Sequence, residues 1–392
     1  MKLWQTTENL DPFIERFTTG RDPELDMLLL PYDCEASVAH VKMLAKISLI
    51  TADEMEQLVA GLNKIKELHL AGHFSIETKD EDGHTAIEKF LTATLGEAGK
   101  RVHTGRSRND QVLTAMRLFE KDHLLRLTEM IHNLLSAFED VSDRDGHHPL
   151  PGYTHTRKAM PFSVRQWLES FCETLRDDLV LMEATMKVID KNPLGTGAGY
   201  GVPVELDREM TANLLGFDRI LDNPLAAQNG RGKLESRILH DCLMVLGDLN
   251  RWASDVILFT MPEVGYFELS DTVTTGSSIM PHKRNPDLLE LIRAAFGVVS
   301  GYELQCRMIP ANLISGYHRD LQWTKEPVIR GLTLTIEVVQ ASVIAASSLK
   351  ANSEELNRAM TPELLSVRDV MELVAKGVPF REAYRRISNR YK

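Results

Sequence analysis

Cysteine is scarce in this sequence, with only four among 392 residues. They are widely scattered and no two form a CxxC pair, so the chain lacks the spacing of a zinc site and of a disulfide scaffold. Free, buried thiols are the expected state, as in proteins of a reducing compartment. We therefore predict a cytoplasmic protein without a bound metal.

Long apolar runs and an excess of positive charge are missing as well. No uninterrupted apolar stretch approaches the roughly 20 residues of a membrane span, and the first residues of the chain are polar, unlike a secretory signal. The formal net charge of −11 disfavours nucleic acid and anionic membranes as partners, because both require a basic surface. An anionic ligand would have to be held by a local cluster of positive groups.

The alternating pattern of strands is not evident, whereas helical periodicity extends over long stretches. Apolar residues recur every three or four positions, as at Leu127, Ile131, Leu134 and Phe138, which is the spacing of one helix face. Five helices are predicted in this way, at 112–141, 162–189, 234–261, 288–309 and 328–349. All exceed the usual length of about 11 to 12 residues, which suits a helix bundle.

The predicted fold class is therefore all-α, with a central bundle of long helices. Residues 338–349 are nearly free of charge around the whole helix, so other helices, from the same chain or from other subunits, must enclose them. Composition suggests three parts. They are a mainly helical N-terminal domain (1–104), the central bundle domain (105–350) and a short helical C-terminal domain (351–392).

Residues 274–286, Thr-Thr-Gly-Ser-Ser-Ile-Met-Pro-His-Lys-Arg-Asn-Pro, form the most informative loop. Asn285 followed by Pro286 indicates the start of a helix. The unpaired N–H groups and positive end of that helix would lie beside Lys283, which provides a seat for a carboxylate. On local physics alone, a solvated turn before a capped helix explains the segment about equally well.

The same loop resembles the Gly-Ser-Ser-Ile-Met-Pro-x-Lys-x-Asn-Pro signature of the fumarase/aspartase superfamily, whose members cleave a C–N or C–O bond and release fumarate. The resemblance implies that Ser277 is the base that removes a proton beside a carboxylate, and that Lys283 and Asn285 bind that carboxylate. Glu290 matches a family carboxylate near the catalytic histidine. No His-Asp pair adjoins Ser277 in the sequence, so the means of its activation stays open.

A second segment, His-Thr-Gly-Arg-Ser-Arg-Asn-Asp-Gln at 103–111, resembles a motif that is particular to the argininosuccinate lyases. Ser107, Arg108 and Asn109 precede a long predicted helix and offer a guanidinium and neutral donors to a substrate carboxylate. Taken alone, a basic turn that caps a helix would be the better explanation.

Three further segments match the same family. The resemblance implies that Thr154 contacts the substrate carboxylate and that His155, with Glu290 as its carboxylate partner, acts near the leaving group. The remaining candidates for substrate binding are His84, Thr85, Tyr317, Gln322 and Lys325, of which the last three match positions that hold the amino-acid end of argininosuccinate.

The resemblance implies reversible elimination of fumarate from argininosuccinate to give arginine, without metal or cofactor. It also implies a homotetramer whose bundle is shared and whose active sites each take segments from three chains. Two alternatives remain: a lyase for another fumarate-yielding substrate, such as adenylosuccinate or aspartate, and a non-catalytic relative of the lens crystallin kind.

The sequence departs from the family pattern in its N-terminal part and after His155. Residues 5–8 and 17–20 replace segments that carry family contacts, so a serine that reaches the substrate is not obvious there. Arg157 adds a positive charge where the family often has glutamine. The chain also ends soon after residue 384, so either the third domain is abbreviated or the given sequence stops before its end.

Overall fold

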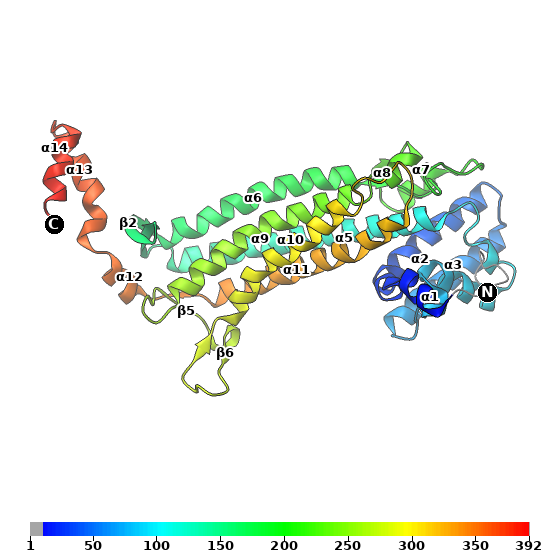
Figure 1. Cartoon of the computed structure of the whole chain (residues 1–392), viewed down its shortest axis with the longest axis horizontal. Coiled ribbons are helices and arrows are strands. Elements are labelled where there is room, and N and C mark those ends of the chain that lie inside the picture. Colours follow the sequence, from blue (N-terminus) through cyan, green and yellow to red (C-terminus); the bar gives the residue numbers. More distant parts are fainter. Residues whose placement is uncertain (1–10, 392) are drawn as a thin grey trace. The chain divides into compact units, whose positions relative to one another are not determined.

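The computed structural model describes residues 11–391, and most of its regular structure is helical (Figure 1). The α-helices are α1 (Pro12–Thr19), α2 (Asp22–Lys46), α3 (Ala52–Leu70), α4 (Gly83–Leu95), α5 (Arg108–Asp145), α6 (Val164–Ile189), α7 (Arg208–Leu214), α8 (Pro224–Asn229), α9 (Lys233–Phe259), α10 (Asp287–Met308), α11 (Lys325–Ser348), α12 (Ser353–Ala359), α13 (Ser366–Ala375) and α14 (Phe380–Ser388). Short 3-10 turns are η1 (Thr78–Asp80), η2 (Gly99–Arg101), η3 (Asp271–Val273), η4 (Arg319–Thr324) and η5 (Pro362–Leu365).

The five predicted long helices are confirmed as α5, α6, α9, α10 and α11, with ends that differ by only a few residues. Helix α10 begins at Asp287, one residue before the range 288–309 predicted from periodicity and directly after Pro286, and Asn285 is part of a short strand. The carbonyl of Pro286 accepts the first hydrogen bonds of the helix, from the N–H groups of Leu289 and Glu290. The all-α fold class is confirmed.

Strands occur only as short pairs within the described residues. They are β1 (Pro149–Thr154) with β2 (Arg157–Ser163), β3 (Lys191–Asn192) with β4 (Arg219–Ile220), β5 (Phe267–Glu268) with β8 (Lys350–Ala351), and β6 (Thr275–Gly276) with β7 (Arg284–Asn285). All pairs are antiparallel except β3–β4. The β1–β2 hairpin occupies a segment for which no strand was predicted, and α6 begins after it, at Val164.

The chain folds into two compact units, each built from three stretches. Unit 1 comprises Met1–Leu125, Glu183–His240 and Gly301–Thr333, and unit 2 comprises Arg126–Met182, Asp241–Ser300 and Leu334–Lys392. Each of the five long helices contributes residues to both units. The division at 104 and 350 that composition suggested stays a prediction.

Unit 1 has a core in which α2, α3 and α4 pack together. Its fully buried side chains include Leu44, Leu58, Ile65 and Leu91. Helix α3 begins with a capping box, in which the Thr51 hydroxyl accepts from the Glu54 N–H and the Glu54 carboxylate accepts from the Thr51 N–H. This core fixes the N-terminal ends of α4 and α5, where several of the predicted substrate contacts lie.

Unit 2 is a bundle. The parts of α5, α6, α9, α10 and α11 that belong to it run side by side (Figure 1). Phe138 and Trp252 are fully buried in this bundle, with their ring centroids 5.4 Å apart. The C-terminal helices α13 and α14 pack on each other around Val370, Ala383 and Ile387.

Helix α11 is the most apolar of the long helices. The stretch Arg319–Ser348 is long and apolar enough to cross a membrane by length and composition, although charged residues interrupt it. Half of its most apolar window is buried inside the chain, so the enclosure predicted for residues 338–349 is only partly provided by one chain. Ile344, for example, remains 54% exposed.

Candidate active site

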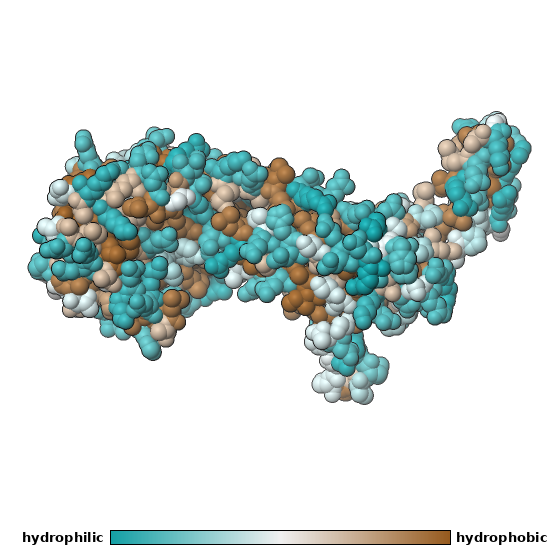
Figure 2. Space-filling view, turned by 180° about the vertical axis from the view of Figure 1, so that it is seen from behind, coloured by the Kyte–Doolittle hydropathy of each residue, from teal (hydrophilic) through white to brown (hydrophobic). Residues whose placement is uncertain are grey.

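The loop with the superfamily signature forms the β6–β7 hairpin of unit 2. Figure 1 shows the hairpin projecting from the bundle, and Figure 2 shows a largely hydrophilic or neutral surface on it. Ile279, between the strands, is 83% exposed. The base of the hairpin is fixed because the Thr275 hydroxyl donates to the Asp287 carboxylate at 2.5 Å. The tip therefore extends into solvent from an anchored base.

Ser277 lies near the tip, and its hydroxyl oxygen accepts two backbone hydrogen bonds. The N–H of Met280 donates at 3.1 Å and the N–H of Ile279 at 3.4 Å. Two N–H dipoles directed at one oxygen favour its negatively charged form. These two contacts hold the Ser277 hydroxyl against the backbone of its own loop, and the role of Ser277 as the base stays a prediction.

Lys283, Asn285 and Glu290 line a cavity of about 900 Å³ in unit 2. The cavity lies where β7 leads into α10, so N–H groups at the start of that helix add to the positive charge of Lys283. Lys283 is exposed and Asn285 is half-buried. Glu268 and Asp287 line the same cavity, and the carboxylate-binding site expected here stays a prediction.

Thr154 and His155 lie on the other hairpin, at the turn between β1 and β2. His155 and Thr156 have φ angles of 51° and 58°, in the left-handed region that glycine and asparagine usually occupy. Both side chains are exposed. Strained, non-glycine turn residues often mark functional sites, and here the turn directs a histidine toward solvent.

The catalytic candidates do not meet within one chain. No hydrogen bond or ion pair joins Ser277, His155 and Glu290 among residues 11–391, and neither Ser277 nor His155 lines the cavity of Lys283. The β1–β2 and β6–β7 hairpins are separate projections of unit 2 (Figure 1). A complete site would require another copy of the chain or a movement of the hairpins.

The substrate-binding candidates Ser107, Arg108 and Asn109 lie at the start of α5 in unit 1. Ser107 caps the helix, since its hydroxyl accepts from the Asn109 N–H at 3.2 Å. The buried Asp110 carboxylate accepts from the N–H groups of Ser107, Gly195 and Gly197, each at 2.9 Å. Asp110 thus links residues 103–111 to the glycine-rich loop that contains Gly195 and Gly197, and it holds the backbone of both segments in place.

Arg108 bridges two acidic residues of the neighbouring segment. Its Nε donates to Asp82 at 2.6 Å and its Nη1 to Glu81 at 3.3 Å. Arg319 also pairs with Glu81, at 3.1 Å. The Arg108 side chain is 35% exposed, so the ion pairs orient a guanidinium that solvent and ligands still reach.

Lys325 is almost completely buried and ion-paired on two sides. Its ammonium donates to Asp26 at 2.6 Å and to Asp22 at 2.9 Å. Burial lowers the pKa of Lys325, but the two carboxylates outweigh it and raise the pKa overall. An ammonium has three N–H donors, and at least two of those of Lys325 are taken by Asp22 and Asp26.

Tyr317 and Gln322 lie on the segment that leads into α11. The Gln322 amide donates to the carbonyls of Thr18 and Thr19, at 3.1 and 3.3 Å. These two residues belong to the stretch where the sequence departs from the family, so that stretch supports Gln322 through its backbone. The other departing stretch, residues 5–8, lies outside the described residues.

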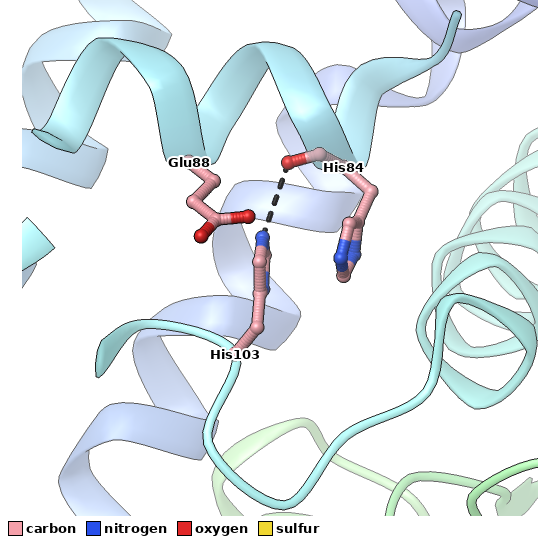
Figure 3. Close-up of side chains that lie close together, drawn as sticks. All are labelled: His84, Glu88 and His103. Atoms are coloured by element: carbon pink, nitrogen blue, oxygen red, sulfur yellow. Dashed lines mark hydrogen bonds between the residues drawn. The ribbon is translucent and has the colours of Figure 1, made fainter. Parts of the chain in front are cut away.

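His84 and Thr85 lie in the first turn of α4. The His84 ring stacks on the His103 ring, with centroids 3.6 Å apart (Figure 3). The Thr85 N–H donates to Asp82 at 2.9 Å. Burial lowers the pKa of His84 to about 3, with the positive charge of Arg106 as a further cause. His84 is therefore neutral at physiological pH, and its Nδ1 bonds to the Gln111 side chain.

His84, Glu88 and His103 lie close enough together to suggest a metal site (Figure 3). The hydrogen bonds of His103 argue against one. Its Nδ1 accepts from Arg106 at 2.8 Å, so its proton is on Nε2, which lies 3.1 Å from the His84 carbonyl. Both ring nitrogens are occupied, and the Arg106 charge would repel a divalent ion.

Sequence reasoning missed the residues that hold these candidates in place. They are Asp22, Asp26, Glu81, Asp82, Asp110, Asn229, Arg231 and Arg319. Asp110 was visible only as part of a motif. The acidic spacing of Asp22 and Asp26, four residues apart on one helix face, was the signal available for that pair.

Comparison with known proteins shows the family and the fold of the chain. Residues 5–301 match the family model described as lyase. A class II fumarase from Schistosoma mansoni has the same fold, with a TM-score of 0.80 at 15% identity over 95% of this chain and 91% of that one.

Relatives with higher sequence identity show to which group of lyases the chain belongs. The chain is 45% identical to an argininosuccinate lyase of Thermotoga neapolitana, over 100% of this chain and 98% of the relative. It is 44% identical to an argininosuccinate lyase of Sorangium cellulosum, over 99% of this chain and 90% of the relative. The chain therefore belongs to the lyase family and, within it, to the argininosuccinate lyases.

Proposed function

We propose that this protein eliminates fumarate from argininosuccinate and releases arginine, a step of arginine biosynthesis. The observation that carries the proposal is the Ser277 hydroxyl, which accepts two backbone N–H groups on the loop with the superfamily signature. Such an oxygen is prepared to bear negative charge and to take a proton from carbon. The relatives at 44 and 45% identity carry the same activity in their names.

The proposed reaction begins at the Cβ–H bond of the succinyl part. The Ser277 alkoxide takes this proton, and the electron pair moves into the adjacent carboxylate to form the aci-carboxylate. Lys283 and Asn285 stabilise that doubly charged group. The C–N bond then breaks, the double bond of fumarate forms, and the departing nitrogen takes up a proton to give the guanidinium of arginine. His155, supported by Glu290, is the proposed source of that proton.

Recognition of the other substrate groups falls mainly to unit 1 in this proposal. Ser107, Arg108 and Asn109 of unit 1 hold the dicarboxylate end, with Thr154 of unit 2 as a further contact, whereas Tyr317, Gln322 and Lys325 of unit 1 hold the amino-acid end. His84 and Thr85 contribute neutral hydrogen-bonding groups. No step calls for a metal or a cofactor.

We propose that the protein is a homotetramer with shared active sites, and that it is cytoplasmic. Helix α10 supports the tetramer, because Leu291, Val298 and Met308 are 70, 47 and 58% exposed along one helix. Single chains rarely leave such a surface uncovered. The four cysteines are free and buried, as expected in a reducing compartment.

The function is tested by following fumarate absorbance with purified protein and argininosuccinate. Adenylosuccinate and aspartate are the matched controls for the two competing lyase activities. Preferred turnover of either would contradict the proposal, and no turnover of any of the three would favour a crystallin-like relative. Sedimentation equilibrium tests the assembly, and a fully active monomer at micromolar concentration would exclude shared sites.

A further inference from the structure

Tyr317 and Gln322 lie on a loop, residues 315–322, that is mostly exposed or half-buried. Side chains on such a loop can bind a ligand specifically only if the backbone that carries them is held in place. The loop has no regular secondary structure before η4 begins at Arg319. Its shape must come from neighbours elsewhere in unit 1.

Asn229, at the end of α8, holds the first part of this loop. Its Oδ1 accepts from the Gly316 N–H at 3.1 Å, and its Nδ2 donates to the Ser315 hydroxyl at 3.4 Å. Gly316 has a φ of +113°, and a Cβ there would lie 3.1 Å from the Tyr200 hydroxyl oxygen. The backbone is thus fixed directly before Tyr317.

Arg231, two residues further on, holds the second part. It is only 6% exposed. Its Nη2 donates to the Leu321 carbonyl at 3.2 Å, directly before Gln322, and its Cζ lies 5.6 Å from the centre of the Tyr317 ring. A guanidinium over an aromatic face is attractive, so Arg231 fixes both the backbone and the ring.

The segment that carries these two residues is itself held firmly. The Glu235 carboxylate accepts from the Gly232 N–H at 2.5 Å and from the buried Arg117 at 3.2 Å. Gly232 has a φ of +78°, and a Cβ there would lie 2.7 Å from the Cys306 carbonyl oxygen. Asn229 and Arg231 therefore extend from a rigid base.

We propose that Asn229 and Arg231 are positioning residues that hold residues 315–322 so that Tyr317 and Gln322 bind the amino-acid end of argininosuccinate. The proposal rests on the proposed function for the identity of the ligand. Neither residue takes part in proton transfer. Their loss should therefore weaken binding of the arginine part and leave the chemical step largely unchanged.

The test compares Asn229→Ala and Arg231→Lys with wild type. Asn229 is exposed, so its replacement should fold, and Arg231→Lys keeps the buried charge near Glu235 but loses the planar fork. Each should raise KM for argininosuccinate and the inhibition constant of arginine by about five- to tenfold, as expected for one or two lost hydrogen bonds. The kcat and the inhibition constant of fumarate should change less than about twofold.

Lys233→Gln is the control, because Lys233 is an exposed cation two residues beyond Arg231. It should match wild type. A lower melting temperature with unchanged KM in both variants would show a purely structural role and overturn the proposal. Equal weakening of fumarate and arginine, or a loss confined to kcat, would overturn it too.

If the proposed function itself is wrong, the wild-type protein will release no fumarate from argininosuccinate. In that event, calorimetric titration with arginine still compares wild type with Asn229→Ala. Equal affinities, or no binding to either, would overturn the positioning role, and weaker binding to the variant would support it without the lyase reaction.

Discussion

Unit 1 and the β6–β7 hairpin of unit 2 differ in how far their polar residues are buried and hydrogen-bonded. In unit 1, Lys325 is 3% exposed and bonded to two carboxylates, and Asp110 accepts three backbone N–H groups. On the hairpin, Lys283 is exposed and Ser277 is bonded only to its own loop. The polar groups of the first region are fixed by burial and hydrogen bonds, whereas those of the second are open to water within a single chain.

The largest expected effect lies in the buried ion pairs. Lys325→Met leaves Asp22 and Asp26 buried without their cation, which should cost about 3 to 5 kcal/mol of unfolding free energy. Lys283→Met, at an exposed site, should change stability by less than about 0.5 kcal/mol. Urea unfolding of both variants measures the contrast, and equal stabilities would show that the two regions do not differ as described.

The pH dependence of the same variant sharpens this contrast. Burial already raises the pKa of Asp22 although Lys325 lowers it, so removal of the lysine raises the pKa further. A carboxyl whose pKa is higher in the folded than in the unfolded state stabilises the fold while protonated, and that stability is lost as pH rises. The loss of unfolding free energy caused by Lys325→Met should therefore be smaller near pH 4 than near pH 8.

Ser277→Ala should give the next largest effect, a loss of kcat of roughly a hundredfold or more, about 2.7 kcal/mol. Binding of arginine and fumarate should be largely kept, because the change removes a proton acceptor and not a carboxylate ligand. Ser278→Ala is the matched control and should lose less. If steady-state kinetics showed the larger loss of kcat for Ser278→Ala, the base would be Ser278 and not Ser277.

Arg108→Leu should have a smaller effect, about 1.5 to 3 kcal/mol, which is a roughly ten- to hundredfold loss of kcat/KM. The variant loses a guanidinium that Asp82 and Glu81 orient for a carboxylate. Arg101→Leu removes an exposed arginine of the same unit and should stay within about twofold of wild type. A similar loss of kcat/KM in both variants would show that the net charge, and not the position of Arg108, is responsible.

The smallest effect concerns the strained turn of unit 2. Thr156→Gly relieves a φ of 58° and should stabilise the protein by about 0.5 to 1 kcal/mol. Ser136→Gly, in the interior of α5, should instead destabilise by about 0.5 kcal/mol. Thermal unfolding measures both, and a destabilised Thr156→Gly variant would show that the turn stores no strain.

The sequence predicted the long helices well because their apolar residues recur with helical spacing over 20 or more positions. The β1–β2 hairpin escaped prediction because Thr154, His155 and Thr156 lack the Asn-Gly pattern of a two-residue turn. The motifs located the candidates in both units. Their supports could not be predicted, because the Lys325–Asp22 contact joins residues 303 positions apart and the bonds to Ser277 depend on loop conformation.

The discontinuous make-up of unit 1 has a consequence for synthesis of the chain. Lys325 emerges from the ribosome 303 residues after Asp22, which at about 5 to 20 residues per second is a delay of roughly 15 to 60 s. Until then, Asp22 and Asp26 of the nascent chain lack their cation. Helix α2 can pack on α3 and α4 soon after they are made, but the ion pairs at its first turns are completed only when most of the chain has been synthesised.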